Sequence, residues 1–153
     1  MKKLIVLILT SFLAMSCETQ FIIDSRLKPY VDSFYHEASL RNIHLPKDNL
    51  IVKIKKGLIN NNQNGLCIEE DKLFGDDQLI VYIDEEYYNN NQCIEGVVFH
   101  ELGHALLNRK HENNTPSLMQ ESSLYSCFTI PGMWPGIDQR SILINELFNP
   151  HIK

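Results

Sequence analysis

The sequence predicts a small α+β domain: a mixed, twisted sheet of about three to four strands, an N-terminal helix, a central helix and a C-terminal helix. Two observations predict this class. Short runs of β-branched and aliphatic residues at 50–54 and 78–83 are typical of strands. Apolar residues recur at three- and four-residue steps within 25–44, 94–107 and 138–148, which is typical of helices.

The first residues have the pattern of a signal peptide. Two lysines precede an apolar run over 4–15, which as a helix would span about 18 Å, well short of a hydrocarbon core of roughly 30 Å. The stretch 13–17, Leu-Ala-Met-Ser-Cys, resembles a bacterial lipobox. Cleavage after a signal peptide of residues 1–16 would leave a lipid-modified Cys17 and a short tether, 17–24. We therefore expect an extracytoplasmic protein, lipid-anchored in a bacterial cell envelope, with ordinary secretion as the alternative.

The remainder, 25–153, has the size of one domain, and the mature chain, 17–153, is acidic. Without the leader, twelve basic residues stand against nineteen acidic ones, a formal charge of −7. No basic cluster remains that would attract nucleic acid, because Lys53, Lys55 and Lys56 are expected on the solvated face of a strand. A mature chain of this length is long enough for a single core, so we expect one domain. We also expect the protein to be a monomer.

The elements follow in order. A helix is expected over 25–44, with Pro29 in its first turn and Leu45-Pro46 as its end. A strand follows at 50–54. The run 60–65 ends in Asn-Gly, the strongest hairpin signal in the chain, and leads into a short strand at 66–68.

A second apolar strand is expected at 78–83, followed by a polar, asparagine-rich segment, 84–92. The central helix then runs over 94–107. A closing helix is expected over 138–148, with Asp138 as its N-terminal cap and Asn-Pro as its end.

The central helix carries the sequence His100-Glu101-Leu102-Gly103-His104. Histidines four residues apart lie on one helix face, where two imidazoles can bind one metal ion. Zinc suits them, since a catalytic zinc has three protein ligands and leaves one position for water. Glu101, beside the first histidine, is then the candidate general base for a metal-activated water.

His111 is the candidate third ligand. It lies seven residues beyond His104, too far to share the same helix face unless the helix ends and the chain bends back. We expect the bend at Asn108, because asparagine readily adopts the left-handed conformation that ends helices.

These residues resemble the metzincin clan of zinc metallopeptidases, whose pattern is HExxHxxGxxH followed by a turn that contains methionine. The resemblance covers about 97–119. It implies a zincin-like domain in which His100, His104 and His111 bind Zn²⁺ and Glu101 is the base. The segment Ser117-Leu118-Met119 matches the methionine turn, which makes Met119 its methionine. Here the motif is one residue longer than in the family, with Asn108 in place of glycine.

Two further assignments concern tyrosine and cysteine side chains. Tyr125, six residues beyond Met119, is the nearest candidate to donate a hydrogen bond to an oxyanion. Three cysteines remain after Cys17, so at most one internal disulfide can form. The sequence leaves the pair open among Cys67, Cys93 and Cys127, and the pairing we favour joins the first two.

The expected function is hydrolysis of a peptide or protein substrate by a zinc-activated water. In one alternative, a gluzincin-type peptidase, the third ligand is a later glutamate, Glu121 or Glu146. In another, the protein is a non-catalytic envelope lipoprotein that binds zinc.

Overall fold

In a computed structural model, the protein is described over residues 20–58, 63–71, 77–90, 93–121, 125–133 and 137–149. The expected signal peptide and Cys17 lie outside these ranges. Within them, no helix is both long and apolar enough to cross a membrane. The described elements are β1 (Phe21–Ile23), α1 (Lys28–Leu40), β2 (Leu50–Lys55), β3 (Gly65–Glu70), β4 (Gln78–Asp84), α2 (Glu85–Asn90), α3 (Ile94–Leu107) and α4 (Gln139–Phe148).

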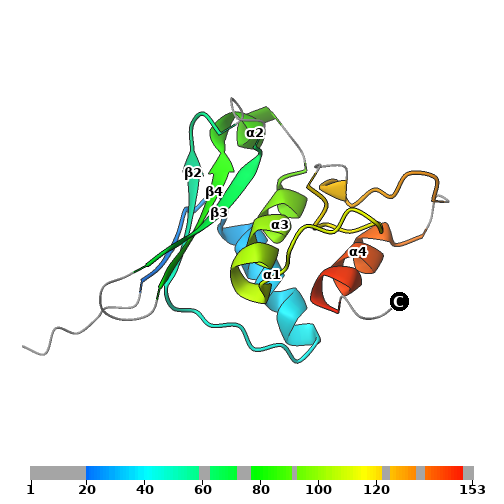
Figure 1. The fold of residues 1–153 in the computed structure, drawn as a ribbon, viewed down its shortest axis with the longest axis horizontal. Helices are drawn as coiled ribbons and strands as arrows, with labels where there is room; N and C mark the ends of the chain where they lie inside the picture. Colours follow the sequence, from blue (N-terminus) through cyan, green and yellow to red (C-terminus); the bar gives the residue numbers. More distant parts are fainter. Residues whose placement is uncertain are drawn as a thin grey trace, which may run out of the picture.

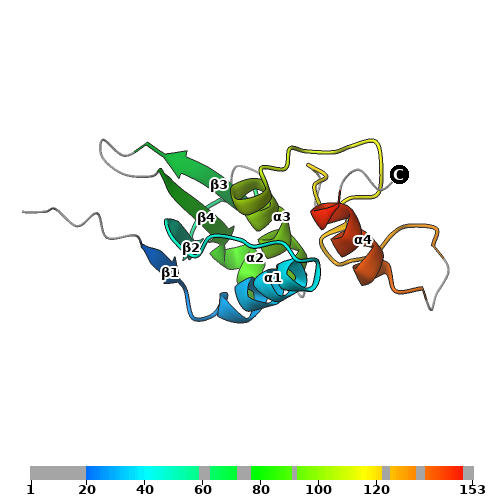
Figure 2. The same cartoon turned by 90° about the horizontal axis from the view of Figure 1, so that it is seen from below.

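The fold is the predicted α+β class, with a four-stranded mixed sheet in the order β1-β2-β4-β3. The first three of these strands are parallel to one another, and β3 runs antiparallel to β4. Helices α1 and α3 lie on one face of the sheet, and α4 lies farther from it (Figure 1). Figure 2, seen from below, shows the same layers and places β1 and β3 at the two edges.

The hairpin expected at Asn64-Gly65 is wrong, because β2 and β3 are not neighbours. Strand β4 lies between them and pairs with β2 in parallel, with Val52 opposite Val81. Burial explains this order: the mainly apolar strands β2 and β4 occupy the centre, whereas β3, which ends in two exposed glutamates, occupies an edge.

Other element boundaries differ in detail from the expected ones. Helix α1 is shorter than the expected 25–44, and the expected tether, 17–24, contains the edge strand β1. The polar segment 84–92 contains a short helix, α2. Asp84 begins it, because its carboxylate accepts hydrogen bonds from the backbone N–H groups of Glu86 and Tyr87.

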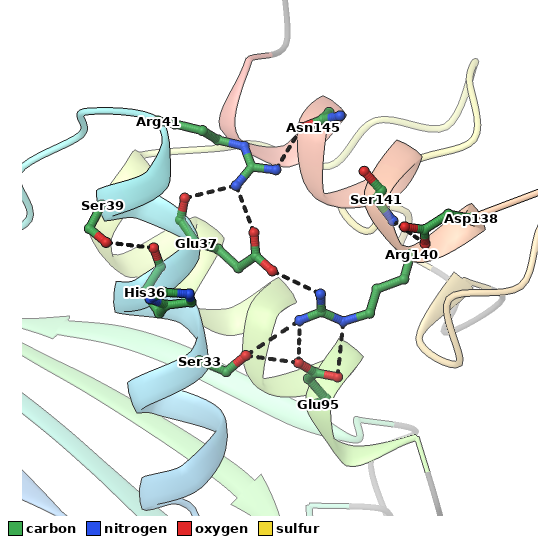
Figure 3. Close-up of polar contacts among 10 residues, drawn as sticks. All are labelled: Ser33, His36, Glu37, Ser39, Arg41, Glu95, Asp138, Arg140, Ser141 and Asn145. Atoms are coloured by element: carbon green, nitrogen blue, oxygen red, sulfur yellow. Dashed lines mark hydrogen bonds and ion pairs between the residues drawn. The ribbon is translucent and has the colours of Figure 1, made fainter.

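The hydrophobic core lies between the sheet and the helices. Phe34 of α1 packs edge-to-face on Phe99 of α3, with 5.1 Å between ring centroids, and also contacts Phe148 of α4. Outside this core, a cluster of ion pairs joins the same three helices (Figure 3). At its centre, Arg140 of α4 binds Glu37 of α1 and Glu95 of α3. The start of α3 is therefore held by both flanking helices.

A disulfide joins Cys93, at the start of α3, to Cys127. The favoured Cys67–Cys93 pairing is therefore wrong, and Cys67 is a free thiol. The bond holds the segment that contains Ser126 against Gly96, leaving no room there for a side chain: a Cβ on Gly96 would overlap the Ser126 backbone carbonyl. The pairing depends on contacts between segments that are distant in the sequence, and no local sequence pattern indicates such contacts.

Gly96→Ala is expected to destabilise the protein by about 3 kcal/mol, because backbone atoms must move to admit the new methyl group. Gly103→Ala is the matched control on the same helix. Its Cβ would mainly meet the side-chain ends of Met119 and Leu147, which can shift. Thermal or denaturant unfolding of both variants measures the difference, and equal stabilities would contradict the tight packing at Gly96.

Candidate metal centre

Helix α3 brings His100 and His104 together as their spacing predicts. Both lie on one face of the helix and are partly buried, and their Nε2 atoms are 3.1 Å apart. Two nitrogens on a tetrahedral zinc with bonds of 2.0–2.1 Å lie about 3.3 Å apart. The separation observed therefore fits ligation of one ion by both rings.

Backbone carbonyls fix how these two rings are turned. His100 Nδ1 lies 2.6 Å from the carbonyl oxygen of Leu118, and His104 Nδ1 lies 2.6 Å from that of Arg109. A carbonyl only accepts hydrogen bonds, so we infer that both Nδ1 atoms carry hydrogen and donate it. In neutral rings both Nε2 atoms then present lone pairs toward each other, an arrangement that a cation between them would stabilise.

His111 reaches the same place because α3 ends as expected. Asn108 has left-handed backbone angles, φ 50° and ψ 35°, and follows the last helical residue. The backbone N–H groups of Asn108 and Arg109 both donate to the carbonyl of Gly103, so the final turn is wider than a regular α-turn. The chain leaves the helix after this turn, and His111 lies beside the two helical histidines.

The three histidines form a group that could hold a metal ion. One ligand nitrogen from each ring lies within 4.8 Å of the others. The ring centroid of His111 is 5.2 Å from that of His100 and 4.8 Å from that of His104. His111 is exposed, whereas the two helical histidines are partly buried, so the group opens to solvent on the His111 side.

The surroundings favour neutral rings, the form that binds metals. Burial, with smaller contributions from His104 and His111, lowers the pKa of His100 to about 4, although the hydrogen bond to the Leu118 carbonyl acts in the opposite direction. Burial also lowers the pKa of His104, and the charge of His111 acts in the same direction.

Glu101 lies beside this group and is directed toward β3. Its side chain is 6% exposed, and a Cβ on Gly65 would lie 2.6 Å from its carboxylate oxygen. The absence of a side chain at Gly65 therefore makes room for the carboxylate. Burial raises the pKa of Glu101 to about 8, and a hydrogen bond from the backbone of Cys67 opposes this rise. A carboxylate with a raised pKa is a stronger base.

A cavity of about 840 Å³ contains the whole group. Its lining comes from β3 and the segment that begins at Gln63, from α3, and from the chain after α3. The lining includes His100, Glu101, His104 and His111 together with Gly65 and Cys67 of β3, Gly96 and Val97 of α3, and Leu118, Glu121 and Ser126 beyond α3.

The segment identified with the methionine turn lies against the same helix. Met119 is fully buried, and a Cβ on Gly103 would come within 2.7 Å of its sulfur. The preceding carbonyl, that of Leu118, is the one that orients His100. These contacts place the turn against α3, beside His100.

Neither glutamate of the gluzincin-type alternative joins the metal-binding group. Glu146 binds Arg109 with one carboxylate oxygen and Ser117 with the other, both at 2.6 Å. Glu121 lines the cavity, but it is not part of the group formed by the three histidines among the described residues. The geometry therefore favours His111 as the third ligand.

Tyr125 and Cys67 differ in their location relative to the cavity. Tyr125 is 9% exposed, belongs to the hydrophobic core and is not among the residues that line the cavity, so geometry does not support its expected oxyanion role. Cys67 does line the cavity. Burial raises the pKa of its thiol to about 11, with the charge of Glu101 adding to the rise, so the thiol stays protonated.

Comparisons of the chain with protein-family models, with curated proteins and with solved structures found no match. The metzincin resemblance therefore remains a hypothesis, carried by the motif and the geometry of the site.

The groups that sequence reasoning missed are those around the ligands. They are the carbonyls of Arg109 and Leu118, the space left by Gly65, and the contacts of Glu146. Carbonyls carry no residue-specific signal, and the remaining groups come from distant parts of the chain.

Proposed function

We propose that this protein is a zinc-dependent peptidase, with zinc held by His100, His104 and His111 and with Glu101 as general base. The observation that carries the proposal is the convergence of three imidazoles, two of them turned by carbonyls so that Nε2 faces the shared point. A buried carboxylate that lines the same cavity supplies the base.

When bound, zinc supplies a Lewis acid that polarises a peptide carbonyl and lowers the pKa of a water molecule. Glu101 accepts the proton of the attacking water and passes it to the nitrogen of the leaving amine. Burial raises its pKa, which makes the carboxylate a stronger base for the first of these transfers. The hydrogen bond from the Cys67 backbone holds the carboxylate in the space that the missing side chain of Gly65 leaves.

Strand β3 offers a binding edge for an extended substrate. It is the outer strand of the sheet on the cavity side, and Gly65, Leu66 and Cys67 line the cavity. An extended peptide can add to such an edge through backbone hydrogen bonds, with the scissile bond directed toward the histidines. We propose that the substrate is a peptide or an unfolded protein segment.

The site of action in the proposal is the bacterial cell envelope, where the lipid-modified Cys17 would anchor a monomeric enzyme outside the cytoplasm. The disulfide between Cys93 and Cys127 is consistent with an oxidising compartment. Secretion without an anchor remains the alternative.

Removal and return of zinc tests the proposal. The wild-type protein is expected to cleave casein or a mixed peptide substrate, to lose this activity on dialysis against a chelator, and to regain it with about one equivalent of Zn²⁺. Magnesium is the control ion, because it prefers oxygen ligands to imidazole. Activity that persists after the zinc is gone would refute the mechanism.

A further inference from the structure

We propose that Glu146 of α4 is a positioning residue for the metal centre: its carboxylate holds in place the two backbone carbonyls that orient His100 and His104. The inference rests on the metal site in the proposed function, but not on the identity of the substrate. Glu146 does not contact the three histidines as a ligand; it acts through Arg109 and Ser117.

One carboxylate oxygen holds the segment after α3. Arg109 Nη2 donates to Glu146 Oε1 at 2.6 Å, and Arg109 Nη1 donates to the backbone carbonyls of Glu146 and Leu147 at 2.9 and 2.6 Å. The Arg109 side chain is only 12% exposed, so these contacts are largely shielded from water. The carbonyl of this same arginine receives the Nδ1 hydrogen of His104.

The other oxygen holds the turn that contains Met119. Ser117 Oγ donates to Glu146 Oε2 at 2.6 Å and accepts a hydrogen bond from the backbone N–H of Met119 at 3.0 Å. Between these two residues lies Leu118, whose carbonyl receives the Nδ1 hydrogen of His100. The serine thus fixes the turn on both sides of the orienting carbonyl.

A single carboxylate therefore joins the two segments that turn the two helical histidines. A third link closes the loop between them, because the backbone N–H of Glu112, next to His111, donates to the carbonyl of Met119 at 2.9 Å. Helix α4 is a firm support for this arrangement, since four of its apolar side chains are buried in the core: Leu143, Ile144, Leu147 and Phe148.

The arrangement needs a carboxylate because it needs two acceptors. Both Arg109 and Ser117 donate to Glu146, and the amide of glutamine has only one acceptor oxygen. Glu146→Gln keeps the size of the side chain but removes the charge that binds Arg109, and its single acceptor oxygen cannot take the place of both carboxylate oxygens. Ser117→Ala removes only the link to the methionine turn.

The test compares metal affinity and coordination in the full-length wild type and in both variants. Zinc affinity is measured by competition with a chelator. The visible absorption of Co²⁺ bound in place of zinc reports the geometry of the ligands. Glu37→Gln is the matched control: Glu37 likewise uses both carboxylate oxygens, one for Arg41 and one for Arg140 of α4, and these contacts belong to the ion-pair cluster of Figure 3.

We expect Glu146→Gln to bind zinc roughly tenfold more weakly than the wild type and to change the cobalt spectrum. Loss of the groups that orient metal ligands weakens metal binding by about this factor or more. We expect Ser117→Ala to weaken binding by a smaller factor, and Glu37→Gln to stay within about twofold of the wild type. A purely structural role would lower the stability of Glu146→Gln and Glu37→Gln alike and leave the cobalt spectrum unchanged.

Wild-type affinity and spectrum in Glu146→Gln would overturn the inference. If that variant fails to fold, Ser117→Ala decides in its place, with a wild-type affinity and spectrum again overturning it. Failure of the proposed function looks different: a wild-type protein that binds zinc but cleaves no peptide leaves the positioning role intact. A wild type that binds no zinc overturns both.

Discussion

Glu101→Gln is expected to lower the rate of peptide cleavage by about 100- to 10,000-fold while zinc stays bound. The amide keeps the size of the side chain but cannot accept the proton of the attacking water. The metal is retained because Glu101 is not part of the group of nitrogens that could hold it. Steady-state cleavage of a peptide and the zinc content of the purified variant measure the two effects separately.

Glu95→Gln is the matched control for this prediction. Glu95 lies on the same helix but binds Arg140 and Ser33 outside the cavity, so its variant is expected to retain cleavage. If Glu101→Gln cleaves as fast as the wild type, Glu101 is not the base. If the wild type binds zinc and cleaves nothing, the non-catalytic zinc-binding lipoprotein becomes the better description.

His111→Ala is expected to weaken zinc binding by more than about 100-fold, because it removes a direct ligand. Loss of a residue that only hydrogen-bonds to a ligand weakens metal binding by roughly 10- to 100-fold. Two imidazoles and water would then have to hold the ion. Chelator competition measures the change in affinity, and unfolding by denaturant checks that the metal-free variant is folded. Since His111 is exposed, we expect the fold to survive the substitution.

Glu121→Ala separates this prediction from a site with a glutamate ligand. Of the two glutamates in the gluzincin-type alternative, Glu121 is the one that lines the cavity, and it is exposed. We expect zinc affinity to be retained in Glu121→Ala. Loss of zinc from Glu121→Ala with retention in His111→Ala would reverse the assignment of the third ligand.

Local signals in the sequence predicted the central helix and its end. The apolar periodicity predicts 94–107, which is the observed extent of α3, and Asn108 has the left-handed conformation expected of it. The spacing of His100 and His104 places both on one helix face. Asp138 likewise begins α4 by accepting a hydrogen bond from the Ser141 backbone, as its position predicts. Each of these features depends on residues within a few positions of one another.

The predictions of the hairpin and of the disulfide pair were wrong because contacts between distant parts of the chain decide both. Asn64-Gly65 is a strong local turn signal, yet β3 pairs with β4 because the apolar strands fill the centre of the sheet. The disulfide joins Cys93 to Cys127 because the folded chain brings that pair together, and neither spacing nor composition indicates it. The oxyanion role expected of Tyr125 stays a prediction, although its side chain packs into the core and is not among the residues that line the cavity.

The sequence by itself determined the candidate metal ligands on α3, the adjacent carboxylate and the bend that follows, because helix periodicity and the preferences of asparagine are local properties. Only the tertiary structure decided that His111 joins them, that two carbonyls turn the rings, and that Glu146 fastens both carbonyl segments. These relations join residues up to 37 positions apart, such as Arg109 and Glu146, and arise only when α4 packs against the core.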